Sequence, residues 1–258
     1  MGAFRNKAAS FFPLAACCAA FFLFSVVGSS SPTLAPCDSG DQQALREFAR
    51  SLVNGWTVLS STWSKESSSC CSWEGVTCTE GINGGAAAVE VARVTDLRLP
   101  GRGLDGFISS SLGRLEQLAN LDLSRNFLRG ALPPELSGLV QLHLLNLSFN
   151  ALSGPVGPAI AGLTSARFID LSSNYFNGTD LSELGGFTRS IQVLDLSMNR
   201  FSGQISDEGI SGCGAVLREL YLDDNSFSGD LPGSLFDLAA LESLSLSSNS
   251  FSGFCPRG

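Results

Sequence analysis

Four cysteines near the start of the chain have the types and spacing best suited to chemistry. Cys70 and Cys71 are adjacent, Cys78 lies seven positions beyond Cys71, and Cys37 precedes all three. Four thiolates could hold a zinc ion, or the same residues could form two disulfides. Adjacent cysteines are poor partners for each other, and the other pairings stay open at this point. In a secreted chain we expect disulfides here and no metal.

Three other groups look catalytic but are interpreted as structural. Segment 101–106 reads G-x-G-x-x-G, the dinucleotide-binding fingerprint, yet no amphipathic helix follows it, and the fingerprint requires one. His143 is the single histidine and has no cysteine nucleophile at a matching outward position. Asp122, Asp170 and Asp195 share one outward column, which we interpret as solvated carboxylates. We therefore predict no catalytic residue, no cofactor and no enzymatic activity.

Composition narrows the class of protein further. The 258 residues include 16 Lys or Arg and 24 Asp or Glu, which gives a formal net charge of −8. An acidic chain without a basic run is a poor partner for phosphate backbones, so nucleic-acid binding is not expected. The 28 Gly and 18 Phe indicate many tight turns around an apolar interior.

The first thirty residues have the layout of a secretory signal peptide. Arg5 and Lys7 precede an apolar run at 11–27, and small residues follow at 28–31. An uncleaved membrane anchor is the less favoured alternative, because Pro13 interrupts the run. We predict a signal peptide at 1–30 and a secreted chain.

A repeat of about 24 residues governs the chain after residue 93. Six copies contain a phrase of the form L-x-x-L-x-L-x-x-N, and a glycine follows four residues later, whereas an earlier, weaker copy has Arg102 at the asparagine position. The asparagines that end the phrase are Asn126, Asn150, Asn174, Asn199, Asn225 and Asn249. We assign residues 94–258 to about six complete repeats and one truncated repeat.

The repeat predicts stacked coils. In L-x-x-L-x-L, alternation turns the leucines inward, as in a short strand. Asparagine both donates and accepts, so at the following corner it can satisfy backbone groups of adjoining coils, which makes this column structural. One coil cannot cover its own interior, so neighbouring coils must stack into an α/β solenoid.

Residues 37–93 are predicted to cap the first coil. Asp41 is a candidate N-cap for a helix whose Ala44, Leu45, Phe48 and Leu52 lie on one face. Cys213 and Cys255 align with apolar columns of the repeats, so we expect both to be buried free thiols.

These segments resemble the plant-type leucine-rich repeat. The phrases LDLSRNFLRGALPPEL and LYLDDNSFSGDLPGSL are similar to the repeat, and CDSGDQQALREFARSL with CCSWEGVTC resembles the N-terminal cap of plant leucine-rich-repeat receptors, most of all the phytosulfokine-receptor type. The resemblance implies a right-handed superhelix with a parallel β-sheet on its concave face and a cap stapled by Cys37–Cys70 and Cys71–Cys78. It also implies receptor-like kinases or receptor-like proteins, although this chain contains no kinase motif.

Five outward apolar residues are the candidates for binding. Leu144, Phe168 and Val193 occupy one outward position in three successive coils and are expected to form an exposed stripe, with Phe149 and Met198 in a second column nearby. Two sequons, at Asn146 and Asn177, are predicted glycosylation sites. A glycan on Asn146 would lie beside the stripe.

The predicted function is recognition outside the cell. We expect a protein or peptide ligand and a co-receptor ectodomain as partners, with the chain secreted or held at the outer face of the plasma membrane. The alternative is a free-standing secreted inhibitor or decoy, similar to polygalacturonase-inhibiting proteins. The last coil has no closing cap, which suggests a fragment or a truncated product.

Overall fold

The computed structural model describes residues 35–59, 62–63, 69–81, 91–180, 190–207, 210 and 216–252. The predicted signal peptide, Cys213 and Cys255 lie outside these residues, so the predictions for them stay untested.

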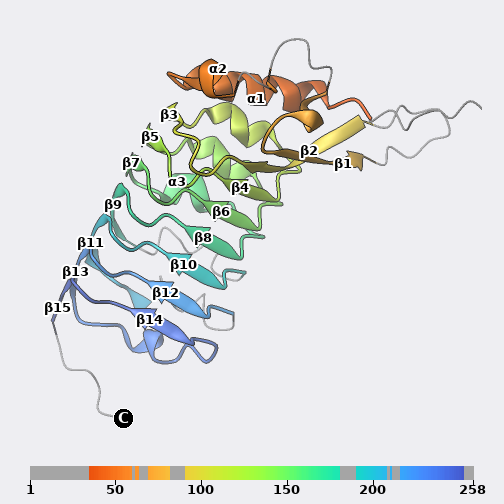
Figure 1. The fold of residues 1–258 in the computed structure, drawn as a ribbon. Helices are drawn as coiled ribbons and strands as arrows, with labels where there is room; N and C mark the ends of the chain where they lie inside the picture. Colours follow the sequence, from red (N-terminus) through yellow and green to blue (C-terminus); the bar gives the residue numbers. More distant parts are fainter. Residues whose placement is uncertain are drawn as a thin grey trace, which may run out of the picture. The chain divides into compact units, whose positions relative to one another are not determined.

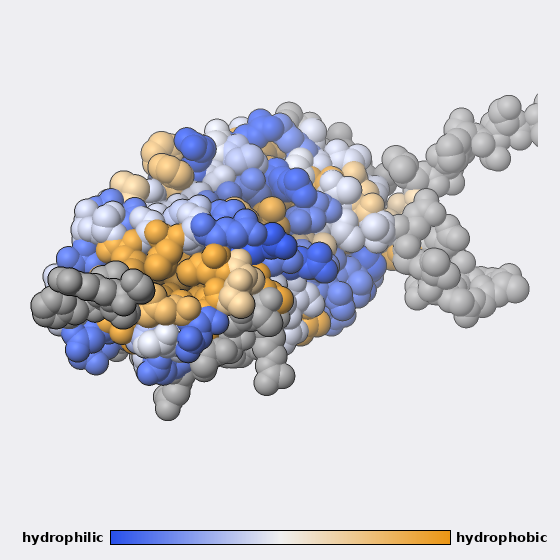
Figure 2. All heavy atoms as spheres, turned by 90° about the horizontal axis from the view of Figure 1, so that it is seen from below, coloured by the Kyte–Doolittle hydropathy of each residue, from blue (hydrophilic) through white to orange (hydrophobic). Residues whose placement is uncertain are grey.

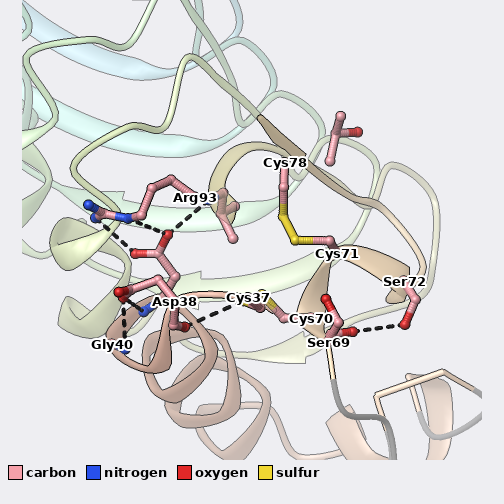
Figure 3. Close-up of a disulfide and its surroundings, with 12 residues drawn as sticks. Cys37, Asp38, Gly40, Ser69, Cys70, Cys71, Ser72, Cys78 and Arg93 are labelled. Atoms are coloured by element: carbon pink, nitrogen blue, oxygen red, sulfur yellow. Dashed lines mark hydrogen bonds and ion pairs between the residues drawn. A yellow bond between two sulfur atoms is a disulfide. The ribbon is translucent and has the colours of Figure 1, made fainter. Parts of the chain in front are cut away.

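The cap begins with helix α1 (Ser39–Ser51), and Asp38 is its N-cap. The Asp38 carboxylate accepts hydrogen bonds from the backbone N–H groups of Gly40 and Asp41 (Figure 3). The prediction that Asp41 caps the helix is therefore wrong. Asp41 lies within the first turn with 1% of its surface exposed, and its carboxylate binds Arg93 and the backbone N–H of Val94. Asp38 is the residue that reaches the free N–H groups of the first turn, while Asp41 faces the sheet.

Two disulfides and two tryptophans hold the rest of the cap together. After α2 (Gly55–Val58) and the 3₁₀ helix η1 (Cys70–Ser72), the strands β1 (Val76–Gly81) and β2 (Val91–Arg98) pair antiparallel. The bonds Cys37–Cys70 and Cys71–Cys78 are formed, as the family resemblance implied (Figure 3). Trp63 stacks on Trp73 with ring centroids 4.9 Å apart, and both rings are buried.

A sheet of eight strands runs along the molecule; its first strand, β1, comes from the cap, and each following strand comes from one coil (Figure 1). Its order is β1-β2-β4-β6-β8-β10-β12-β14, and every pair except β1–β2 is parallel. The strands after β2 are β4 (Asn120–Asp122), β6 (Leu144–Asn146), β8 (Phe168–Asp170), β10 (Val193–Asp195), β12 (Glu219–Tyr221) and β14 (Ser243–Ser245).

A second parallel sheet runs along the stack beside the first. Its seven strands are β3 (Asp105–Gly106), β5 (Phe127–Gly130), β7 (Ala151–Gly154), β9 (Tyr175–Asp180), β11 (Arg200–Gln204), β13 (Ser226–Gly229) and β15 (Ser250–Phe251). Single helical turns return the chain to the first sheet: η2 (Ser110–Arg114), η3 (Pro134–Gly138), α3 (Gly157–Ile160) and η5 (Gly233–Leu235). This arrangement is the predicted leucine-rich-repeat solenoid.

The interior is one continuous apolar core shared by the coils. The middle residue of each strand points inward; Leu121, Leu145 and Ile169 are at most 1% exposed. Phe201 stacks on Phe227, and Phe227 on Phe251, with centroids 6.1 and 6.3 Å apart. At the last coil the core reaches the surface, where Leu244 is 39% exposed, and hydrophobic residues gather at this end of the molecule (Figure 2).

The G-x-G-x-x-G segment serves the contact between cap and repeats. Gly106 lies in β3, which forms an antiparallel bridge to Leu52, and a Cβ on Gly106 would lie 2.5 Å from the Ser51 carbonyl oxygen. The helical segment that follows is the five-residue 3₁₀ helix η2 rather than an amphipathic α-helix. The glycine here is needed for close backbone approach.

Candidate recognition surface on the eight-stranded sheet

The asparagine column sets the spacing of the coils. Asn174 is 5% exposed; its Oδ1 accepts from Leu152 N at 3.0 Å in the preceding coil, and its Nδ2 donates to Leu147 O at 3.0 Å in that coil. Nδ2 also donates to Leu171 O and Ser172 O in its own coil. The same side-chain bonds to the preceding coil are made by Asn126, Asn150, Asn199, Asn225 and Asn249. Because both the donor and the acceptor of the amide are used, the outward side chains of neighbouring strands are held in fixed register.

The three apolar side chains predicted to form a stripe are in register, and we call them the apolar row. Leu144 of β6 pairs with Phe168 of β8, which pairs with Val193 of β10. All three are half-buried, so the row is only partly exposed. Parallel strands lie about 4.8 Å apart, and side chains at that spacing cover part of one another.

Two positions further along the same strands lies an acidic row, formed by Asp122, Asp170 and Asp195 with Asn146 among them. The Oδ1 of Asp195 accepts from Ser197 N at 2.9 Å and from Ser197 Oγ at 2.6 Å. The other three residues make the same pair of bonds to the serine two positions later. These side chains are half-buried and hydrogen-bonded to the following turn, so the carboxylates are only partly solvated and also support the turn.

The environment of Asp195 disfavours its charge. Burial raises the pKa of the Asp195 carboxyl above its ordinary value, although the hydrogen bonds from Ser197 oppose this shift. The negative charges of Asp170 and Asp223 raise it further. The acidic row is therefore densest in negative charge around β8, β10 and the turn after β12.

Phe149 and Met198 belong to a corner row at the turn after each strand, together with Arg125, Ser173, Asp224 and Ser248. All six have a positive φ, between 52° and 58°, a left-handed conformation that the sequence did not reveal. Phe149 and Met198 are 47% and 53% exposed, as predicted. The Arg125 guanidinium lies 4.6 Å from the centroid of the Phe149 ring, and Ser173 Oγ lies 3.4 Å from the Met198 sulfur.

Sequence reasoning missed three acidic residues of the next coil, of which Glu219 lies in register with Val193 of the apolar row and not with Asp195. Glu219 accepts from the Tyr221 hydroxyl at 2.9 Å, and Asp223 and Asp224 follow in the turn. The signal was present in LYLDDN, where two aspartates stand at positions taken by serine or by a varied residue in other repeats. Among the described residues, neither Asp170, Asp195 nor Asp223 forms an ion pair, whereas Arg98 pairs with Asp96 at 3.0 Å at the other end of the sheet.

The remaining candidate residues lie apart from this surface or at its edge. Asn177 is exposed on β9 of the second sheet, and Asn146 is half-buried within the acidic row. His143 directly precedes β6. The sulfur atoms of Cys37, Cys70 and Cys71 lie within 4.8 Å of one another, but each is part of a disulfide, so the thiolates that a zinc site needs are not free.

Known proteins share both the cap and the repeats. Family models match at residues 38–79 (Leucine rich repeat N-terminal domain), 117–139 (Leucine Rich Repeat) and 189–251 (Leucine rich repeat). The ectodomain of the receptor kinase SOBIR1 from Arabidopsis thaliana is 32% identical, with a TM-score of 0.59; the match covers 74% of this chain and 95% of that one. The chain belongs to the plant leucine-rich-repeat receptor ectodomains.

Two longer receptors of the same plant match larger shares of this chain. Phytosulfokine receptor 1 of Arabidopsis thaliana is 35% identical over 219 residues, which is 84% of this chain. The chain spans only 20% of that receptor's length. The Arabidopsis receptor kinase HAESA, solved in complex with the peptide hormone IDA and the co-receptor SERK1, has a TM-score of 0.66 at 28% identity; the match covers 81% of this chain and 33% of that chain.

The described part of this ectodomain contains no helix that is both long and apolar enough to cross a membrane.

Proposed function

We propose that this ectodomain binds an extracellular peptide or protein ligand on the outer face of its eight-stranded sheet. The observation that carries the proposal is the apolar row on β6, β8 and β10, held in register directly beside carboxylates that form no ion pair among the described residues. A partly apolar face with fixed geometry can bind a ligand without first being ordered, which lowers the entropy cost of binding.

The proposed partners follow from the relatives. HAESA was solved with a peptide hormone and a co-receptor, which supports a peptide ligand and a co-receptor ectodomain for this chain. The relatives are receptors, which favours the receptor role over the secreted inhibitor. In a longer receptor the bound ligand would couple to a cytoplasmic kinase, while the chain described here acts by binding and carries out no catalytic step.

The proposal includes the predicted processing. A signal peptide at 1–30 would bring the cap at 37–93 and the repeats at 94–258 to the cell exterior, either secreted or at the outer face of the plasma membrane. Glycans are proposed at Asn146 and Asn177. A glycan on Asn146 would cover the β6 end of the apolar row, so the ligand contact is placed on Phe168, Val193 and Met198.

Oxidative footprinting tests the proposal with residues that the chain already has. Met198 is 53% exposed, and the only other methionine is Met1, so oxidation of Met198 is read without ambiguity. The full chain is treated with hydroxyl radicals with and without peptides extracted from apoplastic fluid. We expect the peptide fraction to protect Met198.

Two exposed aromatic residues away from this sheet are the controls. Phe107 and Phe236 are 52% and 49% exposed and should be oxidised equally with and without peptide. Protection of Phe107 or Phe236 with unchanged oxidation of Met198 would show that ligands bind elsewhere on the ectodomain.

A further inference from the structure

The carboxylates of the acidic row are not required by the fold. Each serves its turn through one oxygen, which accepts from a serine N–H and hydroxyl. Asn146 makes the same two bonds with its amide oxygen, at 3.1 and 2.7 Å. An uncharged amide therefore fills the structural role, and the negative charge of Asp170 and Asp195 is left without a structural task.

The folded chain also disfavours the negative charge of Asp195. The pKa of Asp195 is raised by burial and by the neighbouring carboxylates of Asp170 and Asp223. The residue in register with Asp195 on β12 is Tyr221, whose hydroxyl donates to Glu219 instead. Two described arginines of the neighbouring coils are engaged elsewhere, since Arg218 pairs with Glu242 at 2.7 Å and Arg200 lies over the Tyr175 ring. A cation placed here from outside would relieve this repulsion.

The apolar and acidic rows lie on the same strands and face the same side. Phe168 and Asp170 are two positions apart on β8, and Val193 and Asp195 are two positions apart on β10. Two positions along a strand correspond to about 6.7 Å, which is also the distance between alternate side chains of an extended peptide. One ligand strand can therefore set an apolar side chain on the first row and a charged side chain on the second.

We propose that this face binds an extended peptide segment in which a lysine or arginine lies two positions from an apolar side chain, with the cation over Asp170 and Asp195 and the apolar group over Phe168 and Val193. The inference rests on the proposed function and specifies the chemistry of its ligand. Charge complementarity decides the occupant, because an acidic segment would meet unrelieved negative charge from β8 to the turn after β12.

Three synthetic probes of equal length distinguish the chemistry. The first is a fluorescein-labelled peptide that alternates lysine with leucine or phenylalanine; the second replaces each lysine with glutamate; the third replaces each apolar residue with serine. Fluorescence anisotropy with the full chain is expected to show binding of the first probe only, weakening as salt rises. Equal binding of the first and second probes would overturn the inference.

Variants locate the binding. Asp170→Asn and Asp195→Asn should each weaken binding of the lysine probe about fivefold, which corresponds to about 1 kcal/mol for one partly exposed ion pair. Asp237→Asn makes the same charge change on an exposed residue next to η5 and should leave the affinity unchanged. An equal effect of all three substitutions would show that net charge alone attracts the probe and would overturn the inference.

The two proposals fail in different ways. If the glutamate probe binds and Phe168→Ala weakens it, the sheet face is a binding surface and only the basic ligand is refuted. If Met198 stays fully oxidised in the presence of apoplastic peptides, the proposed function itself is refuted. A urea midpoint for each variant at or above that of the unchanged chain shows that lost binding does not reflect unfolding.

Discussion

Replacing Asn174 with alanine tests the stacking of the coils. Asn174 is 5% exposed and makes four hydrogen bonds, two of them to the preceding coil. The carbonyls of Leu147 and Leu171 also accept from Asn150 and Asn199, so they keep a partner after the substitution. The N–H of Leu152 loses the side-chain oxygen that it donates to, at a position where water does not reach.

The expected loss of stability in Asn174→Ala follows from the hydrogen bonds that the substitution removes. A buried N–H without an acceptor costs about 1–3 kcal/mol, and the remaining lost bonds contribute about 1 kcal/mol more. We therefore expect Asn174→Ala to lower the free energy of local opening by about 3 kcal/mol. That change corresponds to roughly hundredfold faster amide exchange around Leu152.

Hydrogen exchange by mass spectrometry is the appropriate assay, because stacked repeats need not unfold in one step. The matched control is Asn249→Ala, which removes the same bonds in the last described coil, where the bond to Ser247 is exposed and water can replace it. We expect the control to cost about 1 kcal/mol. Equal acceleration around Leu152 and Phe227 in the respective variants would refute the claim that the buried amide holds the coils together.

Three further changes probe the cap and the acidic row. Asp41→Asn should lower the free energy of unfolding of the cap by about 2–3 kcal/mol, because the buried carboxylate binds Arg93 and a backbone N–H. The control Glu47→Gln breaks a surface pair with Arg114 and should cost under about 1 kcal/mol. Urea titration followed by tryptophan fluorescence measures both. Removing the Cys37–Cys70 disulfide should cost about 4 kcal/mol and removing Cys71–Cys78 about 2.5 kcal/mol, since the first closes the longer loop and so restricts the unfolded chain more. A reversed order in the same titration would contradict this explanation from chain entropy. Burial raises the pKa of Asp195, so the folded chain binds this proton more readily than the unfolded chain, and the ionised carboxyl lowers the free energy of unfolding as pH rises. Asp195→Asn should therefore raise the urea midpoint at pH 7, and the two midpoints should converge below the ordinary pKa of 3.8. A lower midpoint for the variant at pH 7 would refute the argument.

The position of the helix cap shows why local signals leave ambiguity. Asp38 and Asp41 both suit an N-cap by residue type, but we predicted Asp41 alone. The structure assigns the cap to Asp38, because Asp41 is drawn into an ion pair with Arg93, 52 positions away, and into a bond with the N–H of Val94. A contact over that separation carries no periodic signal in the chain.

The exposure of the apolar row shows the same limit. Alternation within β8 correctly placed Phe168 on the outer face of the sheet, but its half-burial depends on Leu144 and Val193 in the adjoining strands. Likewise, Ser197 stands two positions after Asp195 in the sequence, but the hydrogen bond between them depends on the turn geometry.

The repeat, the inward leucines and the asparagine column could all be predicted from the amino-acid sequence, because they follow from a fixed period and from the alternation of side chains along a strand. The burial of the outward residues, the electrostatic interaction between neighbouring carboxylates and the pairing of the cations became known only from the folded chain. Those properties depend on distances between separate coils, and register across coils is set by hydrogen bonds such as those of Asn174, which form only when the coils stack.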